Sequence, residues 1–419
     1  MRHPAIPVVP GPITEGWPET RLDALCERVN DPIDSTELNN SDWLYYSIPA
    51  LEETGNPQIQ SGEGIDSNKL AVKSGDVLIS KLNPRKSRIA TVTQIGGLQA
   101  IASTEFVVLR PHNVQGRFLS WFLQSEPVRC LLAGRVESVT RSHQRVNPDD
   151  VAKLRVRLPT AAEQTRIANF LDEQTARIDA LIAEKERLDA LLSESLESAV
   201  ENAVLPKVRG RMTPLKRVAL RIITGPFGSA LHSSEYSEGG VPVINPSHII
   251  NGLLCPNTDV SVSQKKVADM SAYKIRAGDV IVGRRGEMGR CAVVPDVGDG
   301  WLCGTGCLLV SPYSEKVLPE YLQLVISSRA AREWLSLESV GSTMENLSAE
   351  IIGRLPGYFP PLQEQGERLL DAKHAMAQHG ALMRHVAEHI ALLREYRSSL
   401  ISAAVTGQLD IGNFGRQVA

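Results

Sequence analysis

Two stretches of the chain space their apolar residues as a long amphipathic helix does. The first runs from Glu163 to Val204 without a glycine or proline, and Pro206 follows it, where a proline would stop the helix. Intervals of three or four residues, or sums of these such as seven and ten, keep one helix face apolar. The residues on that face are Ala168, Leu171, Ile178, Ile182, Leu192, Leu196, Ala199 and Ala203. We therefore expect a spacer helix within 159–205.

The second stretch, within 359–407, shows a more regular pattern. Its apolar residues step alternately by three and four, as at the a and d positions of a coiled coil, with breaks at His379 and Arg397. They are Leu369, Ala372, Met376, Met383, Val386, Ile390, Leu393, Leu400 and Ala404. Gly407 is placed to end the helix. Gly366 and Gly380 weaken the prediction of an unbroken first half.

Each helix needs a partner, because a single apolar seam does not stabilise an isolated helix in water. At about 41 residues, each would span roughly 60 Å. We expect the two helices to pair antiparallel; the alternative is that each folds back onto its own domain. The residues expected to make the pairing are Leu171, Ile178, Ile182, Leu192, Met383, Val386, Ile390, Leu393 and Leu400.

The chain is a duplication, because short motifs recur about 201 positions apart. The recurring pairs are Glu137-Ser138-Val139 with Glu338-Ser339-Val340, Pro159 with Pro360, Glu163-Gln164 with Glu364-Gln365 and, two residues out of step, Gly75-Asp76-Val77 with Gly278-Asp279-Val280. A unit this long exceeds the roughly 20–50 residues of a solenoid repeat. The chain therefore contains two copies of one domain.

Each copy places a globular part before its long helix. The globular parts have short β-prone runs, such as 77–79, 106–109, 280–282 and 308–310, and helical stretches such as 118–123, without a βαβ rhythm. We predict an α+β protein in which two homologous mixed α/β domains are separated by two long antiparallel coiled-coil helices. The predicted parts are an N-terminal segment 1–16, domain 1 at 17–158, a central helix 159–205, domain 2 at 206–358, a C-terminal helix 359–407 and a tail 408–419.

Composition describes an ordinary soluble chain of 419 residues, with 42% apolar and 22% charged residues. No apolar run approaches the roughly 20 residues of a membrane span, and the start of the chain does not resemble a secretory signal. Six cysteines without a paired CxxC pattern fit the reducing cytoplasm. A net charge of −3 argues against a protein wrapped in nucleic acid, but it permits locally basic loops.

Three basic clusters are candidates for nucleic-acid contact. They comprise Lys81, Asn83, Arg85, Lys86 and Arg88 after the Asp76 strand, Arg284, Arg285 and Arg290 after the Asp279 strand, and Arg141, Gln144 and Arg145 before Asn147. Arginine can bind guanine with two hydrogen bonds, asparagine and glutamine can do so for adenine, and lysine suits phosphate. The alternative is solvated surface loops. The two copies have basic clusters at matching positions but with different residues, which favours two domains that each contact a different nucleic-acid sequence.

Motifs that could indicate catalysis or a metal have simpler readings. His385-Val386-Ala387-Glu388-His389 matches a zinc-peptidase pattern, but it lies on the predicted coiled coil. Cys303 and Cys307 lie in a strand-like segment and read as buried apolar residues. Asn147-Pro148-Asp149 reads as the start of a helix rather than part of a nuclease site. With no phosphate-binding loop or nucleophile elbow in the sequence, we expect no catalytic residue and no metal in this chain.

Several of these segments together resemble the specificity subunit of type I restriction-modification enzymes. The motifs are Pro360-Pro361-Leu362-Gln363-Glu364-Gln365 at the start of the second helix, the ending Ser398–Asp410, Trp17-Pro18, Gly225-Pro226-Phe227-Gly228-Ser229, and Tyr236 before Gly240-Val241-Pro242. The first copy departs from the pattern. It has Thr160-Ala161-Ala162 after Pro159, and its helix lacks the Thr-Gly ending.

The resemblance implies that the two domains are target recognition domains, each reading one half of a bipartite site in double-stranded DNA. The helices would dock modification subunits, two in number, which bring S-adenosylmethionine. Motor-nuclease restriction subunits would bring ATP and Mg²⁺. Two rivals are a coiled-coil scaffold that binds only protein, and a methyltransferase or nuclease chain carrying its own recognition domains.

Overall fold

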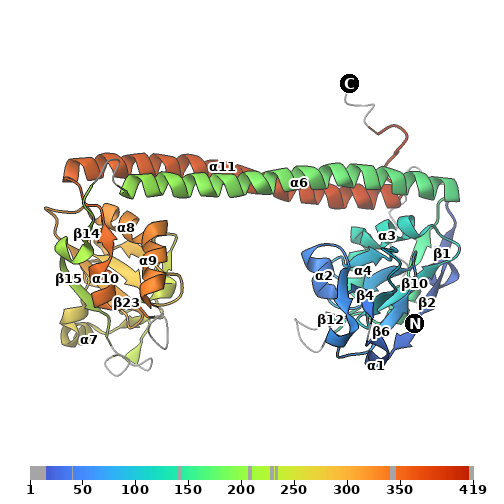
Figure 1. The fold of residues 1–419 in the computed structure, drawn as a ribbon, viewed down its shortest axis with the longest axis horizontal. Helices are drawn as coiled ribbons and strands as arrows, with labels where there is room; N and C mark the ends of the chain where they lie inside the picture. Colours follow the sequence, from blue (N-terminus) through green and yellow to red (C-terminus); the bar gives the residue numbers. More distant parts are fainter. Residues whose placement is uncertain are drawn as a thin grey trace. The chain divides into compact units, whose positions relative to one another are not determined.

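The computed structural model describes residues 16–39, 41–138, 144–205, 210–226, 231, 235–339 and 346–414. The chain divides into two compact units (Figure 1). Unit 1 comprises Met1–Glu186 with Glu388–Ala419, and unit 2 comprises Arg187–Ala387. Each unit contains one globular domain and a part of each long helix. The duplicated α+β organisation predicted from the sequence is therefore confirmed.

Unit 1 begins with the first globular domain. Its strands are β1 (Glu19–Arg21), β2 (Cys26–Val29), β3 (Pro32–Ile33), β4 (Asp42–Tyr46), β5 (Gln58–Ser61), β6 (Lys69–Val72), β7 (Val77–Ser80), β8 (Ile89–Thr91), β9 (Ala100–Ser103), β10 (Phe106–Pro111), β11 (Glu137–Ser138), β12 (Gln144–Arg145) and β13 (Arg155–Arg157). Its helices are α1 (Ser35–Leu38), α2 (Ile48–Glu53), α3 (Gly116–Gln124), α4 (Glu126–Ala133) and α5 (Pro148–Ala152). The long helix α6 (Ala161–Val204) follows.

Unit 2 repeats this plan with changes outside the central sheet. Its strands are β14 (Thr213–Pro214), β15 (Ala219–Thr224), β16 (Val241–Ile244), β17 (Ile249–Ile250), β18 (Leu253–Leu254), β19 (Ser261–Val262), β20 (Val280–Gly283), β21 (Cys291–Val293), β22 (Leu302–Cys303), β23 (Cys307–Pro312) and β24 (Pro356–Gly357). Its helices are α7 (Gln264–Asp269), α8 (Pro319–Ser327), α9 (Arg329–Ser339) and α10 (Ala349–Arg354), followed by the long helix α11 (Leu362–Val405).

The central sheet has the same strand order in both units. It runs β2-β10-β7-β8 in unit 1 and β15-β23-β20-β21 in unit 2, with every pairing antiparallel. A second sheet in each unit contains one parallel pair, β4 with β9 and β16 with β22. Antiparallel pairs and one crossover per domain explain why no βαβ rhythm appears in the sequence.

Both faces of each central sheet are buried, since successive side chains of a strand point to opposite faces. In unit 1, Val77 and Ile79 pack with α3, α4 and the start of α6, whereas Leu78 faces the second sheet. In unit 2, Val280 and Val282 pack with α8 to α10, whereas Ile281 faces the second sheet. This explains the short, continuously apolar strands that the sequence shows.

The repeated Gly-Asp-Val motif supports the start of the central strand in each copy. Asp76 is buried and accepts two hydrogen bonds of 2.8 Å from Arg110 and one of 2.8 Å from the Lys73 backbone. Asp279 accepts the matching bond from the Arg276 backbone at 2.8 Å, but its cation is Arg221, 3.8 Å away. Burial raises the pKa of Asp279. Both domains thus have the supporting carboxylate. The arginine that binds it comes from β10 in unit 1 and from β15 in unit 2.

Within each unit, α6 and α11 run antiparallel. In unit 1, Arg397 binds Asp179 at 2.8 Å and Arg394 binds Glu186 at 2.8 Å. In unit 2, the ring of His379 lies 3.1 Å from the Ser195 hydroxyl. Figure 1 shows the two helices side by side. The antiparallel pairing expected from the apolar seam is therefore confirmed.

The predicted seam residues are buried to different degrees. Leu171, Ile178, Ile182, Val386 and Leu400 are buried, and Leu192, Met383, Ile390 and Leu393 are half-buried. A buried side chain has little surface left for another subunit, so these positions suit helix pairing better than docking.

Candidate nucleic-acid interface

In domain 1, the structure joins two of the predicted basic clusters. The loop after β7 lies against β12: the Asn83 backbone N–H donates to the Gln144 carbonyl at 2.9 Å, and the Val146 N–H donates to the Lys81 carbonyl at 2.9 Å. Asn83 adopts a left-handed backbone conformation, with φ of 46°, which asparagine tolerates better than most residues. Residues 81–88 and 144–145 therefore form a single surface, which we call loop pair 1. Arg141 lies outside the described residues.

Acidic residues neutralise part of loop pair 1. Glu52, from α2, binds Lys86 at 2.8 Å and Arg88 at 2.6 Å. These two hydrogen-bonded cations hold the pKa of Glu52 at about 2, so the carboxylate stays charged at neutral pH. The Arg88 side chain is only 8% exposed and also donates to the Leu82 carbonyl at 2.9 Å. Arg88 therefore supports the loop and presents little surface to a ligand.

Two cations of loop pair 1 keep their charge available. Arg85 is exposed and Lys81 half-buried, and neither side chain has an ion pair with the residues that the structure describes. Arg145 is 60% exposed but binds Glu105 at 2.7 Å. Surface pairs of this kind contribute little energy and exchange partners readily. Arg85 is consequently the strongest candidate in domain 1 for a direct contact with DNA.

Domain 2 builds the same contact with different residues. The Leu347 N–H donates to the Arg284 carbonyl at 3.0 Å, in a position equivalent to that of Val146 and Lys81 in domain 1. The Arg284 guanidinium donates to the carbonyls of Leu347 at 2.9 Å and Thr305 at 3.4 Å. We call residues 284–290 with 346–347 loop pair 2.

The role predicted for Arg284 therefore needs revision. Its guanidinium holds the two segments of loop pair 2 together, and burial, with Arg285 beside it, lowers its pKa. Arg285 is exposed and has no ion pair with any described residue. Arg290 binds Glu287 at 3.1 Å. Arg285 is therefore the exposed, unpaired cation of loop pair 2 among the described residues, as Arg85 is in loop pair 1, although the two do not stand at matching positions.

We expect Arg85→Ala and Arg285→Ala each to weaken DNA binding by about 1–3 kcal/mol if the side chain contacts a base edge. If it contacts phosphate, the salt dependence of log K should fall by about one unit. The dissociation constant, measured by fluorescence anisotropy over a salt series, separates the two cases. Unchanged affinity at low salt in a folded variant would return these residues to the solvated-loop alternative.

Arg284→Ala should act on stability, because it removes charge-assisted hydrogen bonds within the fold, at a cost of about 1–3 kcal/mol. Urea unfolding measures this loss. Arg284→Ala therefore serves as the matched control for Arg285→Ala, which removes an exposed side chain of the same loop.

The neutralising acids were missed by sequence reasoning. Glu52 lies 29 residues before Lys81 on a helix whose position relative to the loop follows only from the sheet order. Glu105 sits one residue before β10, and its carboxylate binds the Arg145 guanidinium at 2.7 Å. Neither acid is adjacent in sequence to the cation it binds, so no local pattern signals the contact.

The remaining motifs have structural roles. Asn147 accepts a hydrogen bond from the Asp149 N–H at 3.0 Å, which confirms it as a helix cap, and Ser348 caps α10 in the same way by accepting one from the Ile351 N–H at 3.2 Å. Cys303 and Cys307 are buried, and burial raises the pKa of both thiols, that of Cys303 to about 12. Among the described residues, no three His, Cys, Asp or Glu side chains group as metal ligands would. No described helix is long and apolar enough to cross a membrane.

Solved structures with this fold come from type I restriction-modification systems. A chain from a study of complex assembly and conformational transition in the type I system matches with a TM-score of 0.75 and 21% identity, covering 94% of this chain and 99% of its own length. The HsdS subunit from Thermoanaerobacter tengcongensis matches with a TM-score of 0.52 and 22% identity, covering 94% and 98%. At these identities the likeness shows the fold.

Sequence comparison reaches the same group of proteins. The chain is 22% identical over 317 residues to the EcoKI specificity subunit of Escherichia coli K12, covering 72% of this chain and 68% of that protein. It is 21% identical over 279 residues to the EcoBI specificity subunit of Escherichia coli, covering 60% and 58%. The profile of the type I restriction modification DNA specificity domain matches residues 14–190 and 227–369. These matches span most of the chain, and we conclude that it belongs to the family of type I restriction-modification DNA specificity proteins.

Proposed function

We propose that this chain chooses the DNA sequence on which a type I restriction-modification complex acts. Recognition domain 1 reads one half of a bipartite site through loop pair 1, and domain 2 reads the other half through loop pair 2. The observation that best supports this proposal is a backbone hydrogen bond that both domains make: the Val146 N–H donates to the Lys81 carbonyl, and the Leu347 N–H donates to the Arg284 carbonyl. Both copies build the same platform and place different side chains on it, as two readers of different half-sites require.

The helix pair supplies a surface for modification subunits. Its seam is occupied by pairing, but large apolar side chains remain exposed on the outer faces. In unit 1 these are Leu181, Leu392 and Tyr396, and in unit 2 they are Leu188, Leu191, Leu370, Met376 and Leu382. Exposed apolar residues on a helix mark a surface for protein contact when they are grouped. Two modification subunits, one on each unit, would match the duplication.

The chemistry belongs to the partners in this proposal. Modification subunits bring S-adenosylmethionine for DNA methylation, and restriction subunits bring ATP and Mg²⁺. The specificity chain contributes no catalytic residue, and the complex works in the cytoplasm, where the DNA lies. A chain that bound modification subunits but no DNA would instead support the scaffold alternative.

Exchange of residues 17–158 for the recognition domain of another specificity chain tests the proposal. The methylated sequence of a cell carrying the hybrid system should change in one half-site only, because domain 2 keeps loop pair 2. The matched control exchanges residues 206–358 and should change the other half. A simultaneous change of both halves in either hybrid would refute the assignment of one reader to each half-site.

A further inference from the structure

The sequence gives α6 and α11 different C-terminal ends, because Pro206 stands after α6 at the position that Gly407 takes after α11. After α11, Gly407 takes a left-handed conformation with φ of 69°, and the N–H of Gln408 donates to the Ala403 carbonyl at 2.9 Å. A glycine in this position closes the last turn with the chain's own backbone. After α6 comes Leu205, whose N–H reaches the Glu201 carbonyl at 3.0 Å. The later carbonyls of α6 need donors from elsewhere.

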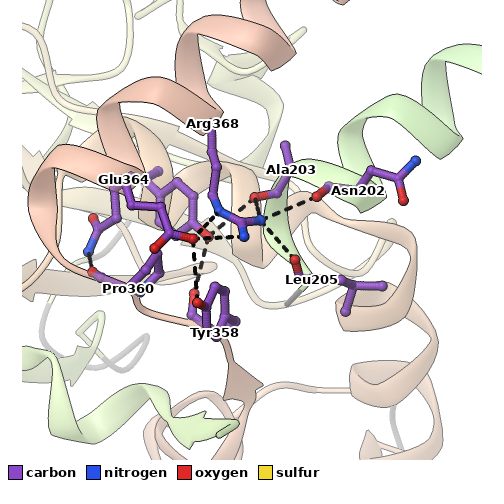
Figure 2. Close-up of polar contacts among 9 residues, drawn as sticks. Asn202, Ala203, Leu205, Tyr358, Pro360, Glu364 and Arg368 are labelled. Carbon is purple, nitrogen blue, oxygen red and sulfur yellow. Dashed lines mark hydrogen bonds and ion pairs between the residues drawn. The ribbon is translucent and has the colours of Figure 1, made fainter. Parts of the chain in front are cut away.

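Arg368 of α11 supplies those donors. Its Nη1 donates to the carbonyls of Asn202 at 3.3 Å, Ala203 at 3.2 Å and Leu205 at 2.8 Å (Figure 2). A guanidinium has five N–H donors and stays charged at any physiological pH. A cation is also favoured at the negative C-terminal end of a helix. One side chain thus satisfies the end of a helix from the neighbouring helix.

Other groups hold the Arg368 guanidinium in place. Glu364, one turn earlier, binds it at 2.8 Å, and the Tyr358 ring lies 5.1 Å from it. The buried hydroxyl of Tyr321, on α8, donates to the carbonyls of Ala203 at 3.3 Å and Tyr358 at 3.2 Å. Figure 2 shows Arg368, Glu364 and Tyr358 gathered at the end of α6. The contact therefore joins α6, α8 and the start of α11.

A further contact seats the end of α6 on recognition domain 2. The Glu201 carboxylate accepts hydrogen bonds from the backbone N–H groups of Arg329 at 3.0 Å and Ala330 at 3.2 Å, at the start of α9. An acid at the N-terminus of a helix is favourable. The same turn of α6 is therefore fixed to α9 by Glu201 and to α11 by Arg368.

The arrangement is specific to the second copy. The residue 201 positions before Arg368 is Ile167, which packs in the apolar core of unit 1. Glu163, the counterpart of Glu364, binds the Thr160 hydroxyl and N–H instead. Unit 1 needs no such cation, because Gly407 follows α11 and closes its last turn. Arg368 thus compensates for the glycine missing from the end of α6.

We propose that Arg368 is a positioning residue that seats the end of α6 on recognition domain 2 and thereby fixes the half-site separation that the subunit accepts. This inference rests on the proposed reading of a bipartite site. It separates two properties of that site: loop pair 2 determines which bases domain 2 reads, and Arg368 determines where along the DNA it reads them.

The test uses the full chain assembled with its modification subunits. Methylation rates are measured on duplexes whose half-sites stand at the native separation or one base pair closer or further apart. Arg368→Gln should lower the preference for the native separation by about tenfold, the factor of one charge-assisted hydrogen bond. Base preference within each half-site should not change. Amide exchange in residues 198–205 should become faster.

Two further variants sharpen the result. Arg368→Lys keeps a cation at the helix end and should restore part of the preference. Arg384→Gln removes an exposed arginine of the same helix and should leave the preference at its wild-type value. If Arg368→Gln does not fold, Tyr321→Phe removes a single hydroxyl from the same carbonyls and should shift the preference in the same direction by a smaller factor.

A folded Arg368→Gln that keeps the wild-type preference would overturn the inference. So would an equal loss of methylation at every separation, since that indicates a structural role alone. If Arg368→Gln does not fold, a Tyr321→Phe variant that keeps the wild-type preference for the native separation would also overturn the inference. Wild-type methylation of a duplex that carries only one half-site, at the rate seen with both, would instead overturn the proposed bipartite reading itself, which distinguishes the two failures.

Discussion

Replacement of Gln365 by Leu should destabilise unit 2 by roughly 3–5 kcal/mol, because each buried hydrogen-bonding group left without a partner costs about 1–3 kcal/mol. Gln365 is fully buried near the start of α11. Its side chain accepts from the Leu318 N–H at 2.9 Å and donates to the carbonyls of Lys316 at 2.8 Å and Pro360 at 2.7 Å. Leucine has a similar volume but can make none of these bonds.

The measurement is urea unfolding followed by circular dichroism, with amide exchange to localise the change to the start of α8 and α11. Gln363→Leu is the matched control, since Gln363 is exposed two residues away and substitutions at such sites stay within about 0.5 kcal/mol. A Gln365→Leu variant within 1 kcal/mol of wild type would show that water or a rearranged backbone replaces the lost bonds.

Gln164 makes the equivalent joint in unit 1. It accepts from the Gln115 N–H at 2.8 Å and donates to the Pro159 carbonyl at 2.9 Å. Gln115 immediately precedes α3, as Leu318 precedes α8. The repeated Glu-Gln motif therefore has a physical reason. It ties the first turn of each long helix to the first large helix of the domain before it.

The sequence was sufficient to predict the parts of the fold that depend on local pattern. The spacing of Leu171, Ile178 and Ile182 predicts a helix with one apolar face, and α6 buries those residues. The repeated Gly-Asp-Val and Glu-Gln motifs predict a duplicated domain with a helix after each copy. Such features depend on near neighbours in sequence, which is why they can be read directly.

The site was less predictable, because its charges are balanced by residues distant in sequence. Local reading treats Arg284 and Arg285 alike, yet the structure turns one to the carbonyls of Leu347 and Thr305 and leaves the other exposed. Likewise, Arg368 interrupts no apolar pattern and carries no motif. Its role depends on the end of another helix, where Pro206 stands in the sequence at the position that Gly407 takes after α11, and whose Leu205 carbonyl Arg368 binds.

Lengthening both long helices by one turn should change the spacing of the DNA site and leave its two half-site sequences unchanged. Four residues inserted after Glu184 and four after Arg394 keep the ion pairs of unit 1 intact, because Asp179 and Arg397 lie on one side of both insertions while Glu186 and Arg394 lie on the other. Each insertion adds roughly 6 Å of helix.

Base pairs rise about 3.4 Å each, so the unread spacer should lengthen by one or two base pairs. Sequencing of methylated adenines in cells carrying the altered system measures this directly. The control inserts the same four residues after Gly96, in an exposed loop of recognition domain 1, and should keep the original spacing. If the two helices set the distance between the half-sites, lengthening both must change that distance. Undiminished methylation at the original spacing in the double insertion would therefore show that contacts made by the domains, and not the helices, determine the distance between half-sites.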